Sequence, residues 1–148
     1  MNKIVAVVKS VNDMKIVTYI TLEVNSIEIM IIKSKKPEWI NVGDTVYFTF
    51  REFSVCVGTA CNGKVSIENR IPATLHLIRK KGSLCELKFN SELGEVVSLM
   101  TEKAFDELEL DVGSKATVLL REIDISLEPY IEALNIEDFM NTRIKVAN

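Results

Sequence analysis

The sequence has few of the residues that most often build metal or catalytic centres. Its 148 residues include three cysteines and one histidine. Cys56, Cys61 and Cys85 form no closely spaced pair, so we interpret them as reduced thiols rather than as a zinc site or a disulfide framework. His76 lies in an apolar stretch, and no nucleophile motif accompanies it. We therefore expect no catalytic residues, no metal site and no enzymatic activity.

Long apolar runs are also absent. No run approaches the roughly 20 residues that a membrane helix needs. The apolar residues 4–8 are followed by Lys9 and by no small-residue cleavage site, which favours a strand over a signal peptide. We expect a cytoplasmic protein without membrane insertion.

The chain has no excess of positive charge. Its net charge is −3 and its pI is about 5.3, which disfavours a nucleic-acid binder because such proteins neutralise phosphates with Lys and Arg. Aromatic residues make up 7% of the chain, few for a protein that stacks single-stranded bases. The composition, 47% hydrophobic and 26% charged, is that of a globular protein.

What the chain does contain is an internal repeat. Residues 41–57 and 111–127 align at a constant separation of 70 residues (121 − 51 = 70), which superposes Gly43 on Gly113. The same separation superposes Arg51-Glu52 on Arg121-Glu122 and Val55 on Ile125. Self-similarity at a fixed offset indicates one structural unit written twice.

Each copy reads as a turn followed by two short strands. A glycine at the turn precedes β-branched and aromatic residues, which favour strands. The Arg-Glu pair then interrupts the apolar run, and an alternating stretch closes the unit near Val57 or Leu127. Two interpretations of each Arg-Glu pair stay open: a solvated ion pair at a strand bend, or part of a binding site.

The pattern along the chain predicts a first module at 1–58, a linker at 59–65, a second module at 66–128 and a C-terminal extension at 129–148. Two roles stay open for the extension: a tail that covers one barrel end, or an oligomer contact. Its residues suit either a helix with an apolar stripe or a last strand. Pro37 is placed to open a short helical turn. Thr101 and the residues up to Leu108 predict a capped helix of one to two turns.

Five short strands with a helical turn before the last two, in about 70 residues, favour a small OB-type barrel. We therefore expect an all-β protein made of two tandem OB-like five-stranded barrels, each with a short helical turn.

At this point the residues resemble a known family, the Mop domain, also called the molybdenum-pterin-binding or TOBE domain. Two copies in tandem resemble the molbindins. The matching positions in the second copy are Ser66, Asn69, Ile71, Thr101, Arg121 and the run from Gly113 to Ile125; those in the first are Asn2, Ile4, Ala6, Gly43, Asp44, Val46, Arg51 and Ser54.

The resemblance implies binding of molybdate or tungstate between modules, for storage or sensing inside the cell and without a DNA-binding domain. Sites between modules imply a homo-oligomer. A tetrahedral dianion needs convergent N–H and O–H donors and one or two cations. The oxyanion-binding residues implied are Ser66, Asn69, Thr101, Lys103 and Arg121, with Asn2, Ser34 and Arg51 from the first copy.

Three carboxylates depart from the family pattern. Glu68 stands where the family has an arginine, and Glu52 and Glu122 replace small residues. A misplaced unit charge near a dianion costs on the order of a few kcal/mol at an effective dielectric near 20. The alternative hypothesis is therefore a protein-interaction module with a degenerate anion site, associated with molybdate transport or its regulation.

Overall fold

The computed structural model describes residues 1–59 and 63–131. Within them it contains ten strands, one α-helix and two single-turn 3-10 helices. The elements in chain order are β1 (Asn2–Asp13), β2 (Thr18–Val24), β3 (Ile27–Lys33), β4 (Thr45–Phe50), η1 (Glu52–Ser54), β5 (Val55–Gly58), β6 (Asn69–Lys81), β7 (Leu84–Ser91), β8 (Gly94–Thr101), α1 (Glu102–Leu108), β9 (Lys115–Leu120), η2 (Glu122–Asp124) and β10 (Ser126–Pro129).

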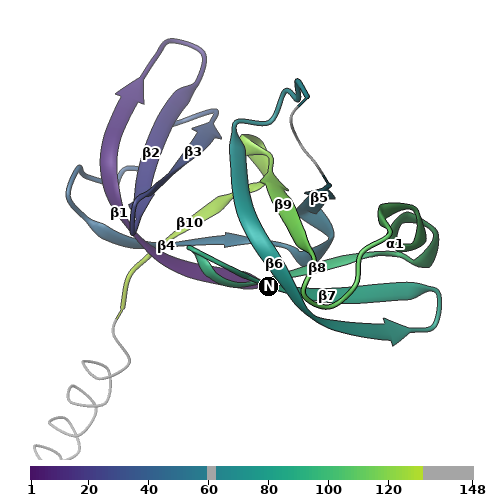
Figure 1. Cartoon of the computed structure of the whole chain (residues 1–148). Helices are drawn as coiled ribbons and strands as arrows, with labels where there is room; N and C mark the ends of the chain where they lie inside the picture. Colours follow the sequence, from purple (N-terminus) through teal and green to yellow (C-terminus); the bar gives the residue numbers. More distant parts are fainter. Residues whose placement is uncertain (60–62, 132–148) are drawn as a thin grey trace, which may run out of the picture.

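The strands form two antiparallel five-stranded sheets, in the orders β10-β4-β1-β2-β3 and β5-β9-β6-β7-β8. Figure 1 shows the purple and blue strands of the first sheet on one side and the teal and green strands of the second on the other. The all-β class, the paired OB-like architecture and the short helix were predicted correctly.

The two halves of the chain exchange their last strands. β5 follows the first half but pairs with β9, and β10 follows the second half but pairs with β4. In Figure 1 the β10 ribbon accordingly runs back across the molecule to β4. The expectation that each repeated pair of strands closes its own module is therefore wrong. The boundaries at residues 58, 65 and 128 stay a prediction, but each sheet takes strands from both sides of them.

The exchange places both halves around one apolar core. Inward-facing residues of β1 and β6 alternate with exposed ones, because successive side chains of a strand point to opposite faces. A single buried cluster contains side chains from both sheets, and it includes Val55 and Ile125 at the start of the exchanged segments. Removing this apolar surface from water is the main force that holds the halves together.

Two buried asparagines fasten each half to the edge strand of the other. The Asn69 side chain accepts from the Met30 N–H and donates to the Met30 carbonyl, both at 2.8 Å, and it donates to the Leu120 carbonyl at 3.0 Å. The Asn2 side chain makes the equivalent pair of bonds with Val97, at 2.8 and 2.9 Å. A carboxamide thus completes the backbone pairing of β3 and of β8.

The repeated glycines lie in tight turns, as predicted. Gly43 has φ +92° and Gly113 has φ +94°, a region that disfavours any side chain. Each glycine N–H donates to a carbonyl of the long first strand of its half, that of Val8 at 2.8 Å and that of Leu75 at 2.7 Å. The turns therefore set how β4 and β9 enter their sheets.

The two predicted helical segments differ in outcome. Thr101 caps α1, because its hydroxyl accepts from the Ala104 N–H at 3.1 Å, so this prediction is confirmed. The short helical turn expected at Pro37 is wrong: a hydrogen-bonded turn stands there, with 3.4 Å between the Ile40 nitrogen and the Pro37 carbonyl. The expected helical stripe or last strand beyond residue 131, and Cys61, lie outside the described residues.

Replacing Asn69 with alanine will destabilise the protein. The substitution removes three hydrogen bonds and leaves the Met30 N–H and carbonyl without their side-chain partner. We expect a loss of about 2–3 kcal/mol in the free energy of unfolding, measured by urea denaturation. Asn90→Ala is the matched control, because Asn90 is exposed on β7 and should change stability by less than about 0.5 kcal/mol. Equal effects of the two variants would contradict the role assigned to Asn69.

The strand exchange predicts a specific cross-link. Cys56 of β5 is directly opposite Leu119 of β9. Opposite residues in antiparallel strands have Cα atoms about 4.5–5.5 Å apart, within the range of a disulfide. Mild oxidation of the folded Leu119→Cys variant should join the two positions, as detected by peptide mass mapping. Val118→Cys is the control, since its thiol points to the other face of β9. A Leu119→Cys protein that forms no such link would refute the pairing of β5 with β9.

Candidate functional site

The two repeated arginines end equivalent strands and begin equivalent turns. Arg51 follows β4 and precedes η1, whereas Arg121 follows β9 and precedes η2. Both have extended backbone angles, and each arginine carbonyl accepts a 3.0 Å bond from the N–H three residues later. Because the last strands are exchanged, η1 packs on β8 and η2 packs on β3. We call these places the η1 position and the η2 position.

The exchange regroups the residues implied by the resemblance. Ser34 directly follows β3, and β3 packs on η2, which belongs to the other copy. Thr101 ends β8, which packs on η1, and it lines a cavity with Phe53 of η1. Both halves therefore meet at each position. Asn69 bonds the carbonyl of Leu120, which precedes Arg121, and Asn2 pairs with Phe50, which precedes Arg51. Ser66 precedes β6 and Lys103 lies in α1.

Several of these residues already have a structural role. The amides of Asn2 and Asn69 bond edge-strand backbone, and the Thr101 hydroxyl caps α1. Ser34, Ser66 and Lys103 are exposed. Among the described residues, no hydrogen bond or ion pair joins Ser66 or Lys103 to either arginine.

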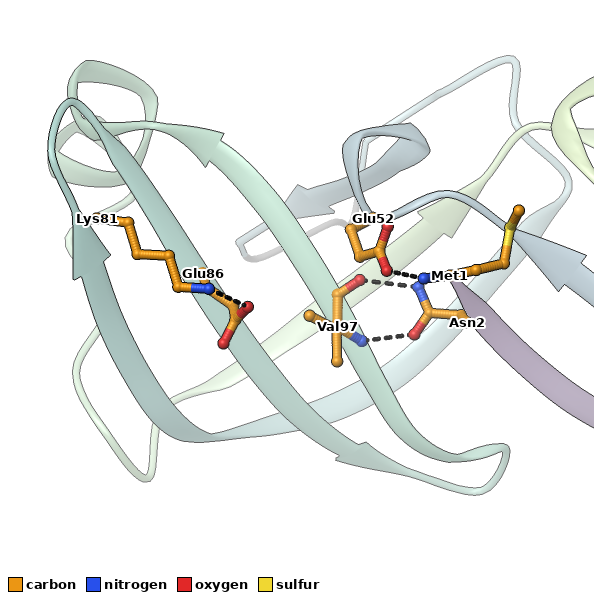
Figure 2. Close-up of polar contacts among 6 residues, drawn as sticks. All are labelled: Met1, Asn2, Glu52, Lys81, Glu86 and Val97. Atoms are coloured by element: carbon orange, nitrogen blue, oxygen red, sulfur yellow. Dashed lines mark hydrogen bonds and ion pairs between the residues drawn. The ribbon is translucent and has the colours of Figure 1, made fainter.

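The two glutamates of the repeat bond nitrogen atoms that precede the asparagines. The Glu122 carboxylate accepts from the Glu68 backbone N–H at 2.6 Å. In the first half, the Glu52 carboxylate accepts from the Met1 ammonium group, next to the bonds between Asn2 and Val97 (Figure 2). This ammonium bond lowers the pKa of Glu52. The interpretation of each Arg-Glu pair as an ion pair is therefore wrong, since both glutamates bond nitrogens outside the repeat.

Figure 2 also shows a contact that lies apart from both positions. The Lys81 ammonium group is 3.3 Å from the Glu86 carboxylate, across the hairpin of β6 and β7. The Lys81 side chain is exposed and that of Glu86 is half-buried, so solvent screens this ion pair in part.

Arg121 has a different partner. Its Nε donates to Asp124 at 2.8 Å and a terminal nitrogen donates to the same carboxylate at 3.2 Å, which raises the pKa of Arg121. Arg51 has Ser54 at the equivalent place, and within the described residues it forms no ion pair. Sequence inspection did not single out Asp124, although a carboxylate three residues after an arginine suits a helical turn.

A cavity of about 300 Å³ lies where β10 joins β4. It is polar, it contains a guanidinium, and it takes residues from both halves of the chain. Its lining residues are Met1, Thr49, Phe50, Arg51, Ser54, Asp124 and Ser126. We name it the η1 cavity. Sequence inspection identified Arg51 from this set by the resemblance, but it could not place Asp124 and Ser126 beside it, because the exchange brings them there.

Lys33 is a second cation that the resemblance did not imply. Its ammonium group donates to the Ile125 carbonyl just after η2, and burial lowers the pKa of this lysine. It stabilises the contact between β3 and the exchanged segment. Lys33 therefore holds the η2 position in place from the opposite half.

The remaining candidate groups have ordinary surroundings. His76 is a strand histidine of β6, as expected, and its Nε2 is 3.1 Å from a Glu95 carboxylate oxygen. Cys85 is buried and Cys56 is exposed. In the part of the chain that the structure describes, no group of three or more His, Cys, Asp or Glu side chains is placed to hold a metal ion.

The second half of the chain is similar to a known family. The TOBE domain model matches residues 65–121. This segment is similar to a TOBE domain. It contains β6 to β9 and α1, and it includes the arginine that opens η2.

The fold of most of the chain also matches a solved structure. The cytoplasmic molybdate-binding protein ModG, crystallised with molybdate bound, superposes with a TM-score of 0.80 at 16% sequence identity. The match covers 87% of this chain and 96% of that one, so the likeness of fold extends beyond the residues that the family model matches. No curated protein matches the chain by sequence. Among the described residues, no helix is long and apolar enough to span a membrane.

The bond to Glu52 predicts a pH-dependent contribution to stability. A carboxylate with a lowered folded pKa stabilises the protein above its ordinary pKa of 4.5, and this contribution is lost as the pH falls through the folded value. Glu52→Gln should therefore lower the free energy of unfolding at pH 6, with the difference from wild type shrinking below pH 4.5. Chemical denaturation at each pH measures it.

The control for that experiment is Glu38→Gln, at an exposed glutamate in the segment between β3 and β4. The difference in free energy of unfolding between this variant and the wild type should not shrink below pH 4.5. If the difference in free energy of unfolding between Glu52→Gln and the wild type persists unchanged to pH 3, the carboxylate charge is not what stabilises the contact.

Proposed function

We propose that this protein binds a tetrahedral oxyanion, molybdate or tungstate, and serves in its storage or sensing inside the cell. The TOBE domain and the fold shared with molybdate-bound ModG support the ligand class. The site is built from residues of both halves, and the protein acts by binding and not by catalysis. Assembly into a homo-oligomer is part of the proposal, since contacts between modules would complete the donor set.

The observation that carries the proposal is the η1 cavity. Its lining residues include Arg51 and three hydroxyl-bearing residues, Thr49, Ser54 and Ser126, together with Asp124. Guanidinium and hydroxyl donors are the groups that hold a dianion through charge-assisted hydrogen bonds. The exchange of strands brings these donors together, and the packed core below them fixes their positions.

A second candidate function is favoured by specific contacts. Arg121 is neutralised by Asp124, and Glu122 takes the Glu68 N–H that an anion would need. The equivalent apolar side chains Phe53 and Ile123 are more than 60% exposed. These features suit a module that binds another protein in molybdate transport or its regulation, with a degenerate anion site.

Binding of an oxyanion should stabilise the folded protein. At 100 times its dissociation constant, a ligand adds about 2.7 kcal/mol of apparent stability. We expect molybdate and tungstate, but not sulfate, to raise the unfolding temperature by several degrees at matched ionic strength. Arg51→Ala should abolish this rise, because it removes the cation of the η1 cavity.

Arg79→Ala is the matched control. Arg79 lies on β6 and its guanidinium is 3.8 Å from Glu86, so the rise should survive its removal. Absence of any rise with the three anions would contradict the proposed ligand and favour the interaction module. A rise that Arg51→Ala leaves intact would place the anion elsewhere.

A further inference from the structure

The η1 and η2 positions share a backbone but differ in one side chain. Both turns show the same alternation of exposure over six residues, from 51 to 56 and from 121 to 126. In both, the N–H of the third residue after the arginine bonds the arginine carbonyl at 3.0 Å. That third residue is Ser54 at η1 and Asp124 at η2. The chain therefore contains its own natural comparison between a hydroxyl and a carboxylate.

At the η2 position the Asp124 carboxylate binds the Arg121 guanidinium. Asp124 accepts from Nε and from a terminal nitrogen of Arg121, at 2.8 and 3.2 Å. These paired donors are the ones through which a guanidinium binds an oxyanion. The Glu122 carboxylate is bonded to the Glu68 backbone N–H, and Lys33 adds a second cation next to η2. A dianion arriving there would find these guanidinium donors occupied and would be repelled by the Asp124 carboxylate.

At the η1 position no carboxylate binds the arginine among the described residues. Ser54 leaves Arg51 without a carboxylate, and within the described residues no ion pair neutralises this arginine. The one glutamate of the turn, Glu52, is balanced by the Met1 ammonium group. Asp124 also lines the η1 cavity, but both of its oxygens are bonded to Arg121. The cavity thus keeps a cation with hydroxyl donors around it.

We propose that the chain binds one oxyanion, at the η1 position, and that Asp124 acts as a built-in anion that fills the equivalent η2 position. This inference rests on the proposed function and deepens it, because it assigns the number of sites and the residue that decides between them. The choice between serine and aspartate at one place in the turn sets whether the arginine is available.

Reciprocal exchange of the two residues tests the proposal. We would titrate the full-length wild type, Ser54→Asp and Asp124→Ser with molybdate and with tungstate by isothermal calorimetry. Equilibrium dialysis with elemental analysis would count bound anions per chain. We expect one anion per chain for the wild type, at least tenfold weaker binding for Ser54→Asp, and two anions per chain for Asp124→Ser. Adding Arg121→Ala to Asp124→Ser should return the count to one.

The count of anions is the deciding measurement, because Asp124 lines the η1 cavity and its removal also changes affinity there. Glu38→Gln serves as the charge control, and thermal unfolding verifies that each variant is folded. Two anions per wild-type chain, or one anion for Asp124→Ser, would overturn the inference while leaving the proposed function standing. Binding by Asp124→Ser alone would support the role of Asp124 and refute oxyanion binding by the wild type. No binding by any variant would refute both.

Discussion

The backbone pairing of β5 with β9 and of β10 with β4 is the constraint on which the rest of the structure depends. It requires each half of the chain to finish in the sheet of the other. One apolar core, two asparagine bridges and the Lys33 contact then follow, since all of them join one half to the other. Neither half holds a complete sheet from its own residues.

The same constraint decides where chemistry is possible. Loops and turns at the ends of exchanged strands are carried to the opposite half, so donors far apart in the sequence become neighbours. Arg51 and Ser54 meet Ser126 in one polar cavity for this reason. The site is thus a property of the pair of halves and does not exist in one repeat.

The repeat also shows how a duplicated unit diverges without losing its fold. The glycine turns, the buried asparagines and the arginines keep their places in both copies. The electrostatics around the arginines differ, because Ser54 and Asp124 tolerate the same backbone but carry different charges. Burial constrains the two asparagines and positive φ constrains the two glycines, whereas the half-buried Ser54 and Asp124 differ in charge without a change of the turn.

The sequence by itself determined the strands, the glycine turns, the Thr101 cap and the twofold repeat, because alternation, turn chemistry and capping act over a few neighbouring residues. It also pointed to Arg51 and Arg121 through the resemblance. Only the tertiary structure decided which strand pairs with which. No local signal separates β5 bonded to β4 from β5 bonded to β9, since either pairing places Val55 and Val57 on the same face. That choice decides the hydrogen-bond partners of the two asparagines and the two glutamates, Asn2, Asn69, Glu52 and Glu122. It also places Asp124 in the cavity that Arg51 lines.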